Sequence, residues 1–155
     1  MFYRLIPNLI MKYSIEKLSK KEVLNLLISC NNSFTPPLSK NIPYTLEEYA
    51  ERLATYADFV LAKEGGEIAG FLAYYTNTEG GFAYIPQVWV SDNHQRKGIG
   101  GQMLNMLIQN IPESLSSVRL EVRKNNEKAV SFYNKMGLVV IKDNDSKLML
   151  EKSIK

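Results

Sequence analysis

The sequence predicts an α/β protein with a mixed sheet, and two observations carry that prediction. First, three apolar runs at residues 59–62, 68–75 and 82–90 are separated by short glycine-containing turns, the pattern of an antiparallel meander. Second, the run 118–122 follows a helical stretch, so its strand returns by a crossover and lies parallel to the strand ending at Val90. Amphipathic stretches on both sides of these runs predict helices that flank the sheet.

Size and composition indicate an ordinary globular protein. The chain has 155 residues, of which 45% are hydrophobic and 23% charged. We expect residues 12–155 to form a single domain and residues 1–11 to be an N-terminal leader. The net charge of +3, with Lys and Arg dispersed, does not favour a nucleic-acid partner. No apolar run approaches the roughly 18 residues of a membrane span.

Cysteine and histidine usage narrows the chemistry. The single cysteine, Cys30, excludes an internal disulfide and lies among Leu26, Leu27 and Ile28, so a buried thiol is expected. With one cysteine and one histidine, a protein zinc site is not expected. These features favour a cytoplasmic protein without a metal. Separately, we expect a monomer or a homodimer.

The N-terminal third predicts an edge strand and two helices. Residues 12–18 alternate weakly, as an edge strand does. Ser19 with Glu22 and Thr45 with Glu48 have the spacing of capping boxes, so each pair begins a helix. The Pro36-Pro37 pair must break the chain between these helices, because proline cannot continue a helix.

The remaining elements follow from the same signals. Pro86 lies inside the third meander strand, where a missing N–H predicts a bulge or a splay. A helix begins near Asn126 and ends at Gly137, which suits the C′ position. Residues 138–141 and 147–151 then form a final hairpin.

A glycine turn between the third meander strand and the next helix is the main candidate site. Free N–H groups at a helix N-terminus bind phosphate, and the neighbouring basic residues add positive charge. The dinucleotide fingerprint fails because its third glycine would fall on Met103, and no Gly-Lys-Ser/Thr sequence completes a P-loop. The alternative is an ordinary strand-to-helix turn. The residues concerned are Gln95, Arg96, Lys97, Gly98, Ile99, Gly100 and Gly101.

Two motifs, in order, give the chain a resemblance to the GNAT superfamily of acyl-CoA-dependent N-acetyltransferases. The first is the pyrophosphate-loop pattern [QR]-x-x-G-x-[GA]. The second is L-x-V-x-x-x-N-x-x-A-x-x-x-Y-x-x-x-G-[FL], on the strand and helix that follow. The matching residues are Gln95, Gly98 and Gly100 for the first motif, and Leu120, Val122, Asn126, Ala129, Tyr133, Gly137 and Leu138 for the second.

The resemblance implies a binding mode for acetyl-CoA. The strands 82–90 and 118–122 splay apart, and the pantetheine arm pairs with free backbone groups of Val88, Trp89 and Val90. The Val88 N–H is the candidate donor to the thioester oxygen. The glycine turn holds the pyrophosphate, and Asn126 contacts the cofactor arm; for Asn126 the alternative is helix capping alone.

The resemblance also places Tyr133 at the sulfur of the cofactor, as the general acid for the leaving thiolate. Transfer from a phenol of pKa ~10 to a thiolate of pKa ~8.5 is uphill by roughly 2 kcal/mol. The alternative is a core aromatic. A primary amine must lose a proton before it attacks, but no base stands out: Tyr84, Gln87, Asp92 and Glu48 are all candidates.

The acceptor is expected to be a primary amine of a small molecule, such as an amino sugar or a polyamine. A peptide or protein amine, and a non-catalytic acyl-CoA sensor, are the alternatives. The loop 34–39 and the helix 44–56 should wall the acceptor pocket. They contribute the aromatic residues Phe34, Tyr44, Tyr49 and Tyr56 and the carboxylates Glu47, Glu48 and Glu51.

Overall fold

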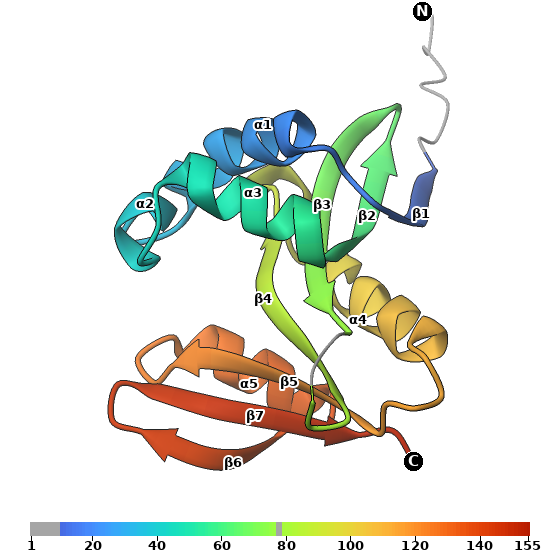
Figure 1. Cartoon of the computed structure of the whole chain (residues 1–155), viewed down its shortest axis with the longest axis vertical. Helices are drawn as coiled ribbons and strands as arrows, with labels where there is room; N and C mark the ends of the chain where they lie inside the picture. Colours follow the sequence, from blue (N-terminus) through green and yellow to red (C-terminus); the bar gives the residue numbers. More distant parts are fainter. Residues whose placement is uncertain (1–9, 77–78) are drawn as a thin grey trace, which may run out of the picture.

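The computed structural model describes residues 10–76 and 79–155, and it confirms the predicted mixed α/β fold. One seven-stranded sheet has the order β1-β2-β3-β4-β5-β7-β6, with helices on both of its faces (Figure 1). The strands are β1 (Met11–Glu16), β2 (Asp58–Glu64), β3 (Glu67–Tyr75), β4 (Phe82–Val90), β5 (Ser117–Arg123), β6 (Val139–Asn144) and β7 (Lys147–Ser153). The helices are α1 (Lys20–Cys30), α2 (Leu38–Asn41), α3 (Leu46–Tyr56), α4 (Ile99–Asn110) and α5 (Glu127–Lys135), with short 3₁₀ turns at Asn31–Ser33 and Asp92–His94.

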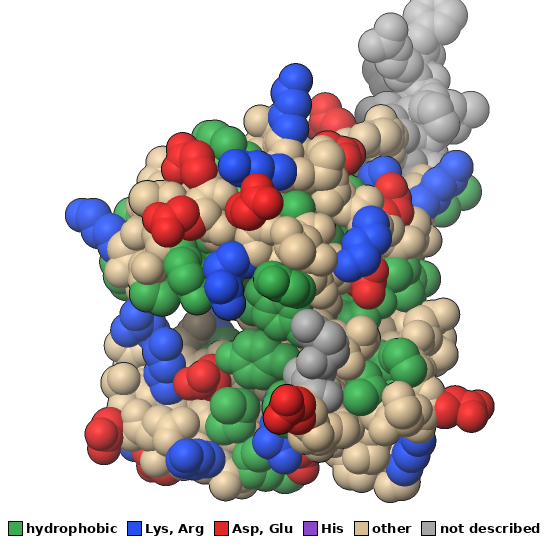
Figure 2. Space-filling view, viewed as in Figure 1, with side chains coloured by type: hydrophobic (Ala, Val, Ile, Leu, Met, Phe, Trp, Pro, Cys, Tyr) green, Lys and Arg blue, Asp and Glu red, His purple; other side chains and the backbone are tan. Residues whose placement is uncertain are grey.

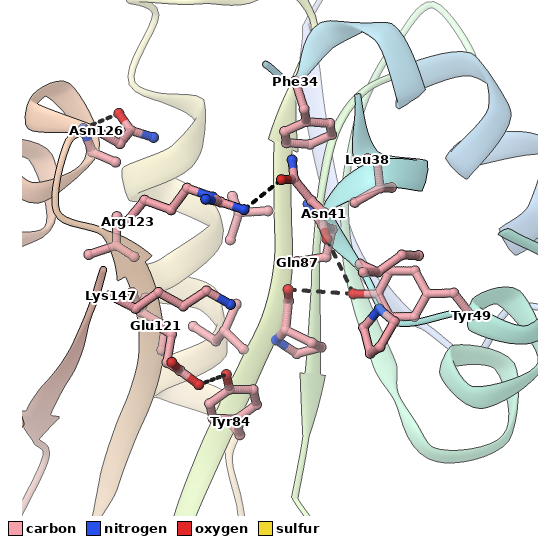
Figure 3. Close-up of a pocket in the computed structure, with 18 of the residues that line it drawn as sticks. Phe34, Leu38, Asn41, Tyr49, Tyr84, Gln87, Glu121, Arg123, Asn126 and Lys147 are labelled. Carbon is pink, nitrogen blue, oxygen red and sulfur yellow. Dashed lines mark hydrogen bonds between the residues drawn. The ribbon is translucent and has the colours of Figure 1, made fainter. Parts of the chain in front are cut away.

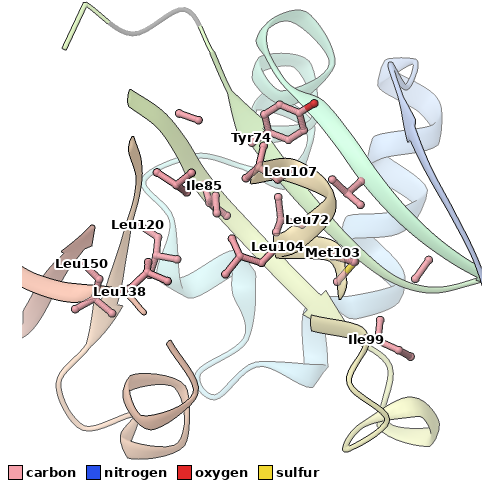
Figure 4. Packing of buried hydrophobic residues seen from close by; sticks show 14 of the residues in the cluster. Leu72, Tyr74, Ile85, Ile99, Met103, Leu104, Leu107, Leu120, Leu138 and Leu150 are labelled. Carbon is pink, nitrogen blue, oxygen red and sulfur yellow. The ribbon is translucent and has the colours of Figure 1, made fainter. Parts of the chain in front are cut away.

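Two hydrophobic clusters cover the two faces of the sheet. The period-2 alternation of β2 sends Phe59 and Leu61 toward α1 and α3, and Val60 toward α4. The α4 cluster continues across β5 and β7 through Leu120 and Leu150 (Figure 4). The α1/α3 cluster includes no residue of β5, β6 or β7. The face of β5 opposite the core therefore remains open to the site.

The predicted helix starts are confirmed in detail. Ser19 and Thr45 each accept a hydrogen bond from the backbone N–H three residues on, and Glu22 and Glu48 bond back to the cap, so both capping boxes are complete. The chain does break at the two prolines, but it also forms the single-turn helix α2, which the sequence analysis did not predict. β1 lies at the sheet edge as expected and ends at Glu16.

Pro86 marks a β-bulge, one of the two outcomes expected for it. Along β3 the partners pass from Ala73, opposite Gln87, to Tyr75, opposite Tyr84, so β4 contains one extra residue there. The extra residue reverses the side-chain alternation of β4. As a result, both Ile85 before the bulge and Val88 after it pack on the α4 side of the sheet.

The parallel pair β4–β5 also splays, the second outcome expected. Its register covers Phe82 to Tyr84 opposite Ser117 to Arg119, and among the described residues the two strands do not pair beyond that point. β5 continues instead in a seven-residue ladder with β7. The two halves of the sheet therefore diverge toward the carboxyl ends of β4 and β5, as Figure 1 shows.

Two expectations fall on residues outside this description. The leader was expected at residues 1–11, of which only residues 10 and 11 are described, and the turn before β4 includes residues 77 and 78. Within residues 10–76 and 79–155, no helix is long and apolar enough to cross a membrane.

Cys30 provides a test of the packing under α1. Its side chain is fully buried, and burial raises the pKa of the thiol to about 11. Because the thiolate is the reactive form, we expect the native protein at pH 8 to react with a thiol-specific reagent far more slowly than the urea-unfolded protein. Rapid stoichiometric labelling of the native protein would contradict this packing.

Candidate acyl-transfer site

A cavity of about 920 Å³ occupies the gap between the diverging strands β4 and β5. It opens on the face that α1 and α3 only partly cover, where Figure 2 shows a hollow with Lys and Arg side chains at its rim. One wall comes from β4 and the α2–α3 region, and the other from β5, β7 and the start of α5 (Figure 3). Of the residues predicted to bind the cofactor or to catalyse transfer, Val88, Asn126 and Tyr133 line this cavity.

The edge of β4 that faces the gap has free backbone groups. The Ser91 N–H donates to the Ala69 carbonyl, which makes this pair a hydrogen-bonded one. Because such pairs alternate along an antiparallel ladder, the peptide groups of Trp89 face β3, while those of Val88 and Val90 face away from it, toward β5. β5 has already diverged there, so the Val88 peptide groups and the Val90 N–H point into the gap, while the Val90 carbonyl accepts a hydrogen bond from the Gln95 side chain.

Trp89 therefore differs from its two neighbours. Its backbone pairs with β3, and its indole packs against Phe71 in the cluster under α1 and α3, with ring centroids 6.1 Å apart. The expectation that Val88, Trp89 and Val90 share one binding edge is corrected for Trp89, because alternate residues of a strand direct their peptide groups to opposite sides.

The glycine turn forms the N-terminus of α4, beyond the end of β4 and outside the lining of the cavity. Gly98 is the N-cap residue with φ +76°, and Arg96 also adopts a left-handed conformation, with φ +66°. No atom lies within 4 Å of the position that a Cβ at Gly98 would occupy. The turn thus presents backbone N–H groups on an open surface, and the exposed Arg96 and Lys97 lie beside them.

Hydrogen bonds of His94 and Gln95 hold the turn in place. His94 contacts the Ser91 hydroxyl through Nδ1 and Glu64 through Nε2, the latter at 3.2 Å. The Gln95 side-chain amide donates to the Val90 carbonyl at 3.3 Å. His94 is half-buried and connects the turn to Glu64 at the end of β2.

Gly100 and Gly101 serve the packing of the two site helices. A Cβ at Gly100 would lie 3.3 Å from the ring of Phe132, and one at Gly101 would lie 3.5 Å from the Met136 sulfur. Both contacts are with α5. These two glycines therefore permit the close approach of α4 to α5. Helix packing is thus a reason for glycine at these two positions that does not depend on phosphate binding.

α5 brings Asn126 and Tyr133 to the cavity from the core side. Asn126 is the N-cap of α5, and its Oδ1 accepts a hydrogen bond from the Ala129 N–H at 3.2 Å. Tyr133 packs partly against the α4 cluster, and burial raises the pKa of its hydroxyl to about 12. Tyr133 is thus a neutral phenol at physiological pH, with its ring held by packing and its side chain at the cavity wall.

Glu121 was not predicted from the sequence, although among the described residues it is the one carboxylate that lines the cavity. Its Oε1 accepts a hydrogen bond from the Tyr84 hydroxyl at 3.4 Å (Figure 3). Burial, followed by the charge of Glu121, raises the pKa of Tyr84 to about 12, so Tyr84 stays a hydrogen-bond donor. Glu121 lies between the core residues Leu120 and Val122, and the alternation of a strand would have placed it on the open face.

Two of the suggested bases lie elsewhere. The Glu48 carboxylate is engaged in its capping box, where backbone and side-chain hydrogen bonds from Thr45 lower its pKa, and it does not line the cavity. Asp92 lies in the 3₁₀ turn and accepts a weak hydrogen bond from Gln95 at 3.5 Å. Of the other two, Gln87 accepts a hydrogen bond from the buried Tyr49 at 3.2 Å, which fixes it in the cavity wall.

The acceptor wall is only partly the one expected. Phe34, Tyr44 and Tyr49 line the cavity as predicted, whereas Tyr56 lies outside it. The carboxylates Glu47 and Glu51 line a separate shallow hollow on the outer side of α3. Three cations that had not been considered, Arg52, Arg123 and Lys147, are in the lining instead.

Comparisons with known proteins agree with this geometry. The chain is 29% identical over 120 residues to an N-alpha-acetyltransferase of Sulfurisphaera tokodaii, a match covering 68% of this chain and 70% of the relative. Among solved structures, it resembles the PaiA N-acetyltransferase from Thermoplasma acidophilum in complex with coenzyme A, with a TM-score of 0.72, 20% identity and coverage of 92% and 99%. It also resembles the ribosomal-protein-S18-alanine N-acetyltransferase from Escherichia coli, with a TM-score of 0.69, 17% identity and coverage of 93% and 95%.

Among the described residues, the sheet splays at its one parallel pair, β4–β5, and a glycine turn begins the next helix beside the splay. The sequence pattern of the acetyltransferase (GNAT) family matches residues 21–138 of the chain. The chain belongs to this family of acyl-CoA-dependent N-acetyltransferases.

The N-cap of α5 can be tested separately from any ligand contact. Replacing Asn126 by Ala removes the acceptor for the Ala129 N–H, so we expect the free energy of unfolding to fall by about 1 kcal/mol. Asn126→Ser keeps a capping oxygen and should stay close to the unsubstituted protein. Urea unfolding of the three proteins measures the effect, and equal stability of all three would rule out a capping role.

Proposed function

We propose that the protein transfers an acetyl group from acetyl-CoA directly to a primary amine bound in the cavity. The backbone edge formed by the Val88 peptide groups and the Val90 N–H supports this most strongly, because an extended cofactor arm can pair with it as a strand would. The turn at Gly98 suits a pyrophosphate because its backbone N–H groups are accessible and no side chain covers them.

In this proposal, different residues bind different parts of acetyl-CoA, the acetyl donor. Val88 and Val90 hold the arm, and the turn from Gln95 to Gly101 holds the pyrophosphate, with Gly100 and Gly101 contributing backbone only. Asn126 contacts the arm with its amide nitrogen, since its oxygen is used by the cap. Bound acetyl-CoA supplies an activated thioester, whose acyl carbon the amine attacks.

Glu121 takes the role of general base in this proposal. It is the carboxylate in the lining, and the Tyr84 hydrogen bond orients it toward the gap. A primary amine with a pKa of ~10.4 is almost wholly protonated at neutral pH. Glu121 attracts that ammonium group and accepts its proton, directly or through one water, before the amine attacks.

Val88 and Tyr133 act on the opposite side of the reacting centre. The Val88 N–H points into the gap and donates to the oxygen on which negative charge develops. The Tyr133 hydroxyl donates to the leaving sulfur. Deprotonation of the amine and stabilisation of the thiolate are thus assigned to residues on different walls of the cavity.

We infer that the acceptor is a small molecule, such as an amino sugar or a polyamine-like amine, and that residues 12–155 work as a single domain. The relation to an N-alpha-acetyltransferase favours the N-terminus of a peptide as a second candidate. A cytoplasmic location fits the free thiol of Cys30. Release of coenzyme A with a panel of amines distinguishes all of these from a sensor that binds acyl-CoA without turnover.

Gly98 tests the proposed pyrophosphate turn, with Gly66 as a matched control. Both residues have positive φ and open space around a Cβ, so Ala at either position should cost roughly 1–2 kcal/mol of stability. Only Gly98→Ala redirects the N–H groups of the turn, so we expect roughly ten-fold weaker coenzyme A binding for it alone. Calorimetry measures both proteins, and equal affinities would refute the assignment of the turn.

Tyr133 tests the proposed acid. Tyr133→Phe keeps the ring, so the protein should fold and bind acetyl-CoA, while kcat should fall by ~10²–10⁴-fold. Because burial holds the pKa of Tyr133 at about 12, the unsubstituted enzyme should show no alkaline loss of kcat near pH 10 from this group. An unchanged kcat in the variant would mean that solvent protonates the thiolate.

Glu121 tests the proposed base. Glu121→Gln should lower kcat/KM by ~10²–10⁴-fold at pH 7. The deficit should shrink as the pH approaches ~10.4, where the amine deprotonates without help. Glu67→Gln, at an exposed position outside the cavity, is the matched control and should behave as the unsubstituted enzyme. A deficit that stays constant with pH would make Glu121 a binding residue only.

A further inference from the structure

The cavity contains more positive charge than the proposed chemistry uses. Its lining includes the three cations Arg52, Arg123 and Lys147 and the single carboxylate Glu121. Among the described residues, no carboxylate lies within ion-pair distance of any of these three cations; the ion pairs of the structure involve other residues. The cavity lining thus carries two more positive than negative charges, and no carboxylate in the described part of the chain forms an ion pair with these cations.

Arg123 is held across the mouth of the cavity. One of its guanidinium nitrogens donates to the Asn41 side-chain oxygen at 2.7 Å (Figure 3). The Asn41 amide donates in turn to the Pro36 carbonyl at 2.7 Å. A guanidinium has five N–H donors, so this arrangement fixes Arg123 while leaving most of its donors available. A cation that is already positioned loses little entropy when it binds an anion.

Lys147 lies beside Arg123, and the two positive charges repel each other. The two residues are direct partners in the antiparallel β5–β7 register, and both point into the cavity (Figure 3). Like charges directly opposite on one sheet face are destabilising. Arg52, from α3 on the other wall, lies 4.8 Å above the ring of Tyr44. An anion between these walls would relieve the repulsion between Arg123 and Lys147.

The cofactor phosphates do not explain these charges. The turn proposed to hold the pyrophosphate lies outside the cavity and has its own cations, Arg96 and Lys97. Alternation along β5 puts Arg123 on the face opposite Val122, which packs in the core between the sheet and α4. Glu121 and Arg123 therefore face the same side, the acceptor side, two residues apart.

We propose that the acceptor is an amine that also bears an anionic group, a carboxylate or a phosphate. This inference rests on the proposed function, because it assigns Glu121 to the ammonium end of the acceptor. Arg123 and Lys147, with Arg52 opposite, bind the anionic end. Within the small-molecule class this selects phosphorylated or carboxylated amines over polyamines, which place further positive charge beside the three cations.

Matched pairs of acceptors test the proposal on the full chain. The pairs are glucosamine 6-phosphate against glucosamine, and a peptide beginning Ser-Glu-Glu against one beginning Ser-Lys-Lys; spermidine is the cationic reference. We expect kcat/KM to be higher by roughly ten-fold or more for the anionic member, the effect of one charge-assisted contact. The pair that shows the preference identifies whether the anion belongs to a small molecule or a peptide.

Charge substitutions in the cavity provide the second measurement. Lys147→Glu should reverse the preference within a pair, and Arg123→Gln and Lys147→Gln should raise KM for the anionic acceptor roughly ten-fold with kcat kept. Lys142→Glu, the same charge change on the neighbouring strand β6 and outside the cavity, is the control and should alter neither preference nor KM. Circular dichroism verifies the fold, and the Gln variants carry the test where Lys147→Glu does not fold.

The possible outcomes distinguish failure of the anionic-acceptor proposal from failure of the proposed acetyl transfer. Equal turnover of both members of each pair, or a preference for the cationic member, overturns the anionic acceptor and leaves the acetyltransferase proposal standing. Retained preference in a folded Lys147→Glu protein also overturns it. Absence of transfer to every amine, with coenzyme A still bound, overturns both.

Discussion

The site depends on the early end of the parallel pairing between β4 and β5. Three pairs of described residues join these strands, and beyond Tyr84 and Arg119 no described strand pairs with the backbone of β4 on that side. Buried peptide groups need hydrogen-bond partners, so such an edge is stable only where water or a ligand can reach it. The bulge at Pro86 decides which groups are exposed: it adds one residue to β4, and the peptide groups of Val88 and Val90 then face the gap while their side chains remain in the core.

The second wall of the gap depends on how closely α4 and α5 approach. α5 has no fully buried residue, so its position is set by its ends and by a few contacts. Asn126 caps its start, and Gly137, at φ +94°, ends it. Between them, Phe132 and Met136 fit over the bare backbone of Gly100 and Gly101. The same glycine motif therefore serves two purposes: Gly98 keeps the turn open, and the next two glycines place the helix that carries Tyr133.

Local signals in the sequence predicted most of the fold, and they also indicated the residues that are proposed to bind the cofactor. The capping boxes, the glycine turn between β2 and β3 and the disturbance at Pro86 each depend on neighbouring residues, and each was confirmed. The acceptor side was harder to predict, because Glu121, Arg123 and Lys147 are ordinary polar residues of strands until the splay leaves their face uncovered. Asn41 and Arg123 meet across 82 positions of the chain, and no local pattern predicts such a contact. Trp89 was misplaced because the direction of its peptide groups depends on the ladder with β3.

Burial of Tyr133 has two opposing effects on the proposed acid step. A pKa of about 12 lies about 3.5 above that of an ordinary thiol, so full proton transfer to a well-solvated thiolate would cost on the order of 5 kcal/mol. The apolar surroundings that raise the pKa of Tyr133 also exclude water from the sulfur, and a poorly solvated thiolate is more basic. The pKa of Tyr133 and the pKa of the thiol therefore both rise, and the difference between them becomes smaller. In the proposed mechanism, Tyr133 acts first as a hydrogen-bond donor whose proton follows the charge, while Glu121 keeps its proton chemistry on the solvated wall. The difference in solvation between the two walls thus separates the acid from the base.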